Sequence, residues 1–158
     1  MSNVYSRATI LLAVLVGPTL TYAAPKAELW ERWQKHDPAS KEQIDHSAWD
    51  KFLRQNLIAP HPSGINRVRY QSVGPEDQRL LQAYLRSLQA VAISSYNRSE
   101  QKAYWINLYN ALTVHLIMSR FPVASIRDIN ISPGFFVRGP WGAKLATVEA
   151  EKLSLDDI

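Results

Sequence analysis

The fold is decided by residues 103–118, which read AYWINLYNALTVHLIM. Because successive residues of an α-helix turn by about 100°, the apolar side chains of this run surround almost the whole helix. A helix that is apolar on all sides is buried on all sides. Asparagine and histidine interrupt the run too often for a membrane span. We therefore expect a helix over residues 100–120 that is buried at the centre of the domain.

Three polar residues lie inside this helix: Asn107, Asn110 and His115. The two asparagines are three residues apart and therefore project to the same side. One interpretation is structural: each side chain hydrogen bonds to a neighbouring segment, because an unpaired buried polar group costs about 1–3 kcal/mol. The other is functional: the asparagines orient a substrate in a cleft, and His115 acts as the catalytic base. The sequence leaves both interpretations open.

Two amphipathic helices are expected before this central helix. Apolar spacing predicts the first over residues 27–36. Its buried face consists of Leu29, Trp30 and Trp33. The second is expected to begin at Ser47, whose hydroxyl would cap the helix, with Asp50 completing a capping box. Its buried stripe consists of Trp49, Phe52, Leu53 and Leu57.

A strand and a longer helix are expected to follow a polar loop at residues 56–66. Residues 68–73 alternate enough between apolar and polar types to predict a strand. Pro75 is well placed as the first residue of a helix, where its missing N–H leaves no bond unmade. That helix is expected to extend to Val91. Its buried face consists of Leu81, Tyr84, Leu85 and Leu88.

The C-terminal part predicts only short elements. Ser125 would cap a single helical turn that ends at Ile129. Residues 144–148 predict a strand that pairs with residues 135–137 in a hairpin. Helices mixed with a few short strands indicate an α+β fold that is mostly helical, with a buried central helix.

Residues 154–158, which read SLDDI, have the pattern of a helix start. A serine cap precedes two acidic residues in the first turn, where they favour the helix dipole. Because an isolated helix below about 12–15 residues is marginal, we expect an incomplete domain whose remaining secondary structure is missing. The alternative is that Leu155 and Ile158 dock as a C-terminal tail.

The first 23 residues follow the order of a secretory signal peptide. Arg7 supplies a positive charge, residues 8–16 form an apolar run too short to span a bilayer, and small residues precede the cleavage site. We expect cleavage between Ala23 and Ala24, a periplasmic or secreted protein, and no membrane span in the mature chain. The alternative is a buried N-terminal helix.

Composition limits the classes to which the protein can belong. Its 158 residues suit one domain, and 46% hydrophobic with 10% aromatic residues exclude a disordered chain. Without cysteine, the chain has no disulfide and no cysteine nucleophile. Loss of residues 1–23 would leave a net charge of +3, from 17 basic and 14 acidic residues. The basic residues are scattered, so no nucleic-acid partner is expected.

The sequence contains no Gly-x-Ser-x-Gly, His-Glu-x-x-His or glycine-rich phosphate-loop motif. His36, His46 and His61 lack metal-ligand spacing and are expected to be solvated. A helix start and a solvated surface explain the acidic cluster without a cation. This cluster consists of Glu149, Glu151, Asp156 and Asp157. We therefore predict no metal site and no cofactor, and the partner is unknown.

Three ordered motifs resemble the domain-of-unknown-function family 547 (DUF547). They are AYWINLYNAL at 103–112, FPVASIRDI at 121–129 and KLSLDDI at 152–158. The upstream segment from about Trp49 to Val91 fits the family more loosely. The resemblance therefore implies an N-terminal helical extension at 24–48 and the N-terminal portion of the family domain at 49–158. It also implies that a segment with an Asn-Cys-Ala-Ser-like motif would follow, and that export is common among bacterial members.

The family as a whole has no established activity, and the resemblance permits three hypotheses. The first is an exported protein whose truncated domain is not catalytically competent, because the cysteine-bearing segment is absent. The second is a fragment of a papain-like or transglutaminase-like hydrolase or acyl transferase. In such an enzyme the missing cysteine would be the nucleophile, and His115 or a downstream histidine the base. The third is a non-catalytic periplasmic binding or scaffold domain.

Overall fold

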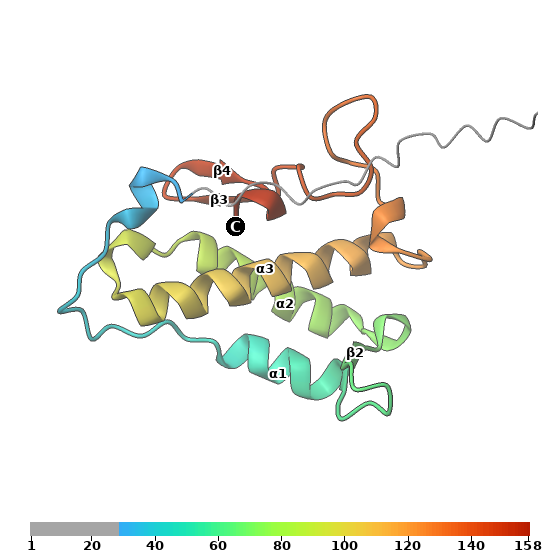
Figure 1. The fold of residues 1–158 in the computed structure, drawn as a ribbon. Coiled ribbons are helices and arrows are strands. Elements are labelled where there is room, and N and C mark those ends of the chain that lie inside the picture. Colours follow the sequence, from blue (N-terminus) through green and yellow to red (C-terminus); the bar gives the residue numbers. More distant parts are fainter. Residues whose placement is uncertain (1–28) are drawn as a thin grey trace, which may run out of the picture.

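The structure, a computed structural model, describes residues 29–158 (Figure 1). Its α-helices are α1 (Ser47–Asn56), α2 (Pro75–Gln89) and α3 (Arg98–Arg120). Its strands form two antiparallel hairpins, β1 (Leu57–Ile58) with β2 (Arg67–Val68) and β3 (Ala146–Val148) with β4 (Glu151–Leu153). Short 3₁₀ turns occur at η1 (Glu31–Gln34), η2 (Tyr70–Ser72), η3 (Ile93–Ser95), η4 (Ile126–Asp128) and η5 (Leu155–Asp157). These elements confirm the mostly helical α+β fold.

The signal-peptide prediction, with its cleavage site between Ala23 and Ala24, lies outside the described residues. Between residues 29 and 158, no helix combines the length and apolar character needed to cross a membrane.

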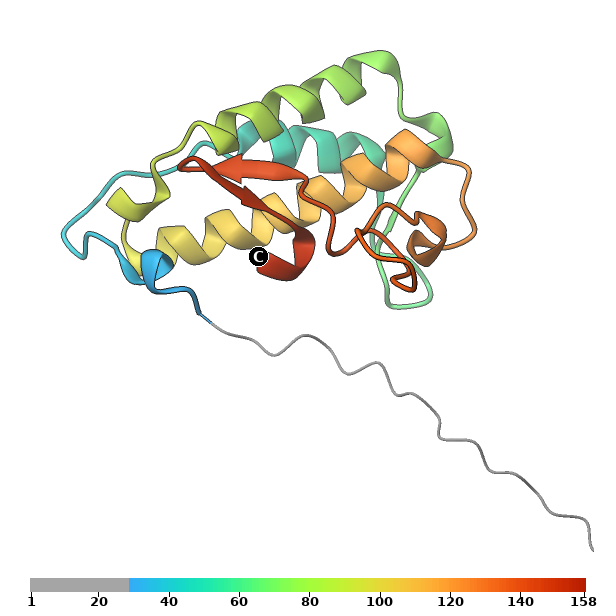
Figure 2. The same ribbon diagram turned by 90° about the horizontal axis from the view of Figure 1, so that it is seen from above.

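Helix α2 lies between α1 and α3, and the β3–β4 hairpin packs over α2 (Figures 1 and 2). Turn η5 rests on α3. One hydrophobic core joins all of these elements, so that Trp33, α1, α2, α3 and the hairpin share buried neighbours. The loops at residues 59–66 and 132–139 project from this body (Figure 1).

The prediction for α2 is confirmed in its start at Pro75 and in its buried face. The predicted residues Leu81, Tyr84, Leu85 and Leu88 are all buried. Helix α3 starts two residues earlier than predicted, because Asn97 caps it by accepting a hydrogen bond from the Glu100 backbone N–H at 3.0 Å. Long periodic segments therefore gave the most accurate predictions.

The prediction that α3 is buried on every side is wrong. Tyr104 and Leu108 are fully buried, and Leu112 is nearly so, which confirms a central position in the core. However, Ile106 is 51% exposed and Asn110 is also exposed. Helix α2 and turn η5 pack on α3, whereas the side that carries Ile106 and Asn110 faces solvent.

The helix predicted over 27–36 is shorter than expected. Within the described part, only the 3₁₀ turn η1 forms; Trp33 is buried, but Leu29 is 68% exposed. The prediction that Ser47 caps α1 is also wrong, because Ser47 is the first helical residue and donates its backbone N–H to Asp45 Oδ1 at 2.8 Å. An aspartate two residues upstream thus takes the role predicted for the serine hydroxyl.

A segment at residues 30–46, here called the N-terminal strap, is tied to the first turn of α3. Arg98 donates to the Trp33 carbonyl at 2.8 Å, and Glu100 accepts from the Ile44 backbone N–H at 2.8 Å. Gln101 Nε2 donates to the Lys35 carbonyl at 2.9 Å. The start of α3 is therefore anchored by polar contacts as well as by the core.

The strand predicted over 68–73 is wrong. Only Arg67 and Val68 pair with another strand, and the following residues turn into η2. The strand predicted over 144–148 is confirmed as β3, but its partner is β4 and not residues 135–137. Residues 135–137 lie instead in a projecting loop. The physical reason is a two-residue turn at Glu149 and Ala150, both with positive φ, whose residue types carry no turn signal.

The helix start predicted at Ser154 is confirmed as η5. Ser154 donates from both its backbone N–H and its hydroxyl to Asp157 Oδ2, at 2.6 Å each. Leu155 is buried in the core, and the half-buried Ile158 packs against it. The packing of Leu155 and Ile158 is the one expected of a docked C-terminal tail. The incomplete domain stays a prediction.

The helical turn predicted after Ser125 is also confirmed. The Ser125 hydroxyl caps it by accepting a hydrogen bond from the Arg127 backbone N–H at 3.2 Å.

Candidate functional site

The predicted site residues lie along the partly exposed side of α3. Asn107 and His115 are half-buried, and Asn110 is exposed. Within residues 29–158, none of these three side chains hydrogen bonds to another group, although other polar side chains of α3 do. The structural interpretation of these residues requires that their side chains are buried and hydrogen bonded. The described residues do not support it.

Two other polar residues of α3 hold the core together. Gln101, which is buried, donates from Nε2 to the Lys35 and Ile93 carbonyls at 2.9 Å each. Tyr104 donates its hydroxyl to the Leu88 carbonyl at 3.0 Å. A buried amide or phenol requires such a partner. Neither role is predicted from the sequence, because Tyr104 counts there only as an apolar residue and Gln101 lies before the buried run.

Burial lowers the pKa of His115 below its usual value near 6.5. The imidazole is therefore neutral at neutral pH, as a general base must be. A base in a nucleophilic site also needs a nucleophile within about 2.6–3.2 Å and a third group that orients the ring. Among the described residues, His115 has neither as a hydrogen-bond partner.

The prediction that His46 is solvated is wrong. Its Nδ1 lies 2.6 Å from the Tyr84 hydroxyl, and its Nε2 is buried without a hydrogen-bond partner in the described chain. Burial, followed by the negative charge of Asp45, raises the pKa of Tyr84. The Tyr84 hydroxyl thus stays protonated at neutral pH, and its contact with His46 joins the strap to α2.

Another histidine contacts a serine. His61 Nδ1 lies 2.7 Å from the Ser63 hydroxyl and also accepts from the Ser63 backbone N–H at 3.1 Å. Both residues belong to the loop between β1 and β2, two positions apart. The contact therefore closes a local turn of the loop and does not form a catalytic pair in a cleft.

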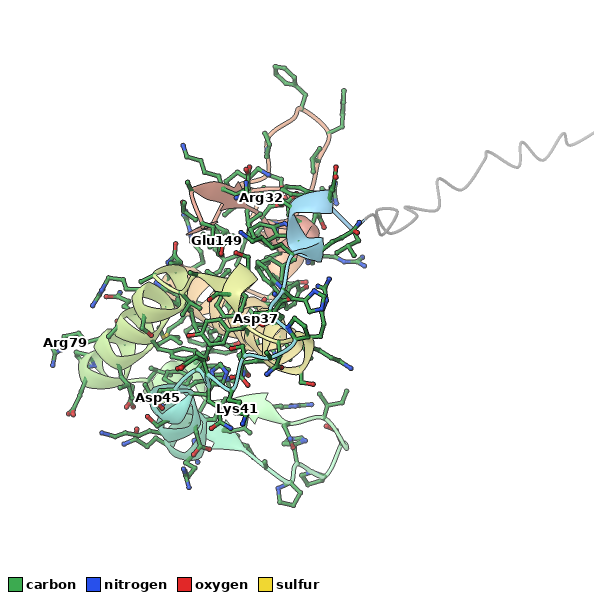
Figure 3. All side chains as sticks on the ribbon, turned by 90° about the vertical axis from the view of Figure 1, so that its left-hand side faces the viewer. Arg32, Asp37, Lys41, Asp45, Arg79 and Glu149 are labelled. Atoms are coloured by element: carbon green, nitrogen blue, oxygen red, sulfur yellow. The ribbon has the colours of Figure 1, made fainter. Side chains whose placement is uncertain are left out.

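The acidic residues are engaged in separate contacts. Glu149 accepts from the Ser94 backbone N–H at 2.9 Å and from its hydroxyl at 2.7 Å. Arg32 pairs with Glu151 at 2.8 Å and donates to the Glu149 carbonyl at 3.0 Å; Figure 3 shows where η1 meets the hairpin. In the part of the chain that the structure describes, no three potential metal ligands cluster.

Asp157 joins η5 to the segment before β3. Lys144 contacts its Oδ2 at 2.6 Å. Burial alone would raise the pKa of Asp157, but the hydrogen bonds from Lys144 and Ser154 outweigh that effect and bring it below its usual value. The carboxylate is therefore ionised at neutral pH and serves the fold.

The most unusual surface feature is the loop at residues 132–139, here called the aromatic loop. Phe135 is 102% exposed and Phe136 is 93% exposed. The prediction of a strand over residues 135–137, which would have covered one face of these side chains, is wrong. The turn sequences Pro133-Gly134 and Gly139-Pro140 enclose this segment, and the structure forms a projecting loop between them instead of the predicted strand.

Residues 93–158 match the family described as Protein of unknown function, DUF547. The resemblance to DUF547 is confirmed over that range. The match contains α3, the aromatic loop, the β3–β4 hairpin and η5, and its partial extent agrees with the prediction that part of the family domain is present. No curated protein and no solved structure matches the chain.

The DUF547 match does not contain α1, α2 or the N-terminal strap. These segments nevertheless contribute Trp33, Phe52 and Leu81 to the core that the matched residues share. The residues before the match therefore cover α3. The division at residues 48 and 49 stays a prediction.

Proposed function

We propose that the chain is an exported, non-catalytic binding domain. The observation that carries this proposal is the isolation of His115, the residue predicted as the base. It has no nucleophile and no orienting side chain as a hydrogen-bond partner among residues 29–158. Positioned nucleophile–base pairs are the mark of covalent catalysis, and the described residues offer none in a cleft.

The binding role is supported by the exposed side of α3. Among residues 29–158, the side-chain amides of Asn107 and Asn110 have no hydrogen-bond partner, and Ile106 beside them is half-exposed. Such a surface offers donors, acceptors and apolar area to a ligand. Export is supported by the order of charge, apolar run and small residues before Ala24.

Hydrolysis assays test the absence of catalysis. The full chain and its His115→Ala variant are incubated with fluorogenic esters and peptides, and both are expected to match the buffer rate. Turnover by the wild-type chain that His115→Ala abolishes, with an unchanged circular dichroism spectrum, would refute the proposal. An Arg79→Ala variant serves as the matched control, because this exposed side chain of α2 lies outside the proposed binding surface and should change the free energy of unfolding by less than about 0.5 kcal/mol.

Mass spectrometry tests export. When the full chain is expressed in a Gram-negative bacterium, the periplasmic or secreted protein is expected to begin at Ala24. A chain that stays in the cytoplasm with residues 1–23 intact would contradict export. It would leave the non-catalytic assignment standing, because the hydrolysis assays do not depend on location.

A second candidate is a fragment of a cysteine-dependent hydrolase or acyl transferase, favoured by the lowered pKa of His115. A neutral, half-buried imidazole suits a base that activates a thiol supplied from elsewhere. The test is labelling of a longer DUF547 protein with a thiol-reactive probe. Absence of labelling at its Asn-Cys-Ala-Ser-like cysteine would eliminate this candidate.

A further inference from the structure

The aromatic loop places two large apolar side chains fully in water. Single exposed apolar residues are common on protein surfaces, but adjacent, fully exposed phenylalanines at the tip of a projecting loop are not. Figures 1 and 3 show that this loop extends beyond the rest of the fold. Phe135 and Phe136 therefore contribute almost nothing to the core and are free for an external partner.

Hydrogen bonds hold the two ends of the aromatic loop together. Ser132 donates its backbone N–H to the Gly139 carbonyl at 3.3 Å, and Gly139 donates its own N–H to Asn130 Oδ1 at 2.9 Å. Gly139 has φ +82°, and a Cβ at this position would lie 2.0 Å from the Trp141 ring. These contacts fix the two ends of the loop, which lowers the entropy lost when the loop binds.

The charged residues between Asp128 and Glu149 are both basic: Arg138, inside the loop, and Lys144, after it. Lys144 is paired with Asp157 at 2.6 Å. Arg138 is exposed and forms no ion pair within residues 29–158, so its guanidinium is available beside the two phenylalanines.

We propose that the aromatic loop binds the surface of an anionic lipid bilayer. Phe135 and Phe136 would enter the boundary between headgroups and acyl chains, and Arg138 would be attracted by the net negative charge of the anionic headgroups. Aromatic and apolar side chains with neighbouring basic residues are the composition that interfacial binding uses. A convex tip favours a bilayer because the lipids close around it, whereas a protein partner must supply a pocket. This binding does not depend on the proposed function.

Sedimentation with large unilamellar vesicles tests the proposal. The full chain is mixed at about 0.15 M salt with vesicles of phosphatidylcholine alone or with added phosphatidylglycerol. Because every variant keeps the same N-terminal residues, differences between variants report on the loop. The wild-type chain is expected to bind the anionic vesicles more strongly. The double variant Phe135→Ser/Phe136→Ser is expected to lose binding by about 100-fold, since each buried ring is worth about tenfold or more.

Three further variants separate the contributions. Arg138→Gln is expected to weaken binding to anionic vesicles about fivefold and to leave binding to phosphatidylcholine unchanged. Phe135→Trp/Phe136→Trp keeps the aromatic surface and should retain binding. Ile65→Ser, at a 70% exposed apolar residue in the other projecting loop, is the matched control and should bind as the wild-type chain does.

Several results would overturn the proposal. They are vesicle binding by the double serine variant that equals wild-type binding, loss of binding in the double tryptophan variant, and absence of wild-type binding to either vesicle. Sedimentation equilibrium without lipid tests the alternative occupant. A wild-type dimer that the double serine variant dissociates would make a second copy of this chain the partner instead.

Discussion

Two turns in the C-terminal segment differ in backbone strain and in the burial of their side chains: the turn between β3 and β4, and the aromatic loop. The turn between β3 and β4 places Glu149 and Ala150 at φ 46° and 67°, a conformation that disfavours residues with a Cβ by about 1–2 kcal/mol each. The aromatic loop instead has glycine at its positive-φ positions, Gly134 and Gly139.

The difference follows from what each turn contacts. Glu149 is held by two hydrogen bonds from Ser94 and, through its carbonyl, by Arg32. These contacts compensate for the strained backbone and connect the hairpin to η1 and η3. The aromatic loop has an unstrained backbone, and its largest side chains touch solvent only. We infer that the hairpin turn serves stability and that the aromatic loop serves binding.

The largest expected effect is that of Glu149→Ala. The variant loses two hydrogen bonds to a carboxylate and leaves the Ser94 N–H without its partner, so the free energy of unfolding should fall by about 2–4 kcal/mol in urea denaturation. Glu151→Ala is the control, because its exposed ion pair with Arg32 is worth less than about 1 kcal/mol. Equal losses in the two variants would contradict the role of Ser94.

Ala150→Gly is expected to act in the opposite direction. Glycine adopts positive φ without a steric penalty, so the substitution should raise the free energy of unfolding by about 1 kcal/mol. Thermal and urea denaturation both measure this change. A loss of stability would show that the turn is not strained at this position.

A pH effect is expected from Asp157, which fastens the segment after the aromatic loop. Its pKa is lower in the folded state than in the unfolded chain, so its stabilising effect is present above about pH 3.8 and is lost as the pH falls through the folded pKa. Urea denaturation of the wild-type chain between pH 6 and pH 2 should show this loss. Asp157→Asn should be less stable at pH 6 and less dependent on pH, whereas parallel curves would refute the assignment.

The smallest expected effect on stability is that of Phe135→Ser/Phe136→Ser. Both side chains are exposed, so the free energy of unfolding should change by less than about 0.5 kcal/mol. A decrease above about 2 kcal/mol would indicate that the rings pack in the fold and would remove the contrast between the two turns.

The sequence predicted the structure best where many consecutive residues follow the helical period of apolar and polar side chains. Helix α2 and its buried face were predicted correctly, because fifteen residues repeat the same pattern. The strand at 68–73 failed because two paired residues and a 3₁₀ turn offer too short a pattern to recognise. The hairpin partner was missed because glutamate and alanine occupy a turn that normally takes asparagine and glycine.

The candidate site was predicted less completely than the fold. Periodicity placed Asn107, Asn110 and His115 on the correct helix. It could not show that one side of that helix faces solvent, because burial depends on which distant segments pack against it. The contacts that fix Glu149, across 55 positions to Ser94, are equally invisible in a local pattern.

Hydrogen–deuterium exchange, with and without anionic vesicles, tests the contrast between the two turns most directly. We expect the amides of residues 134–138 to gain protection only when vesicles are present, while those of residues 146–153 exchange equally slowly in both conditions. Protection that stays unchanged in the loop and appears instead at the hairpin would contradict the account.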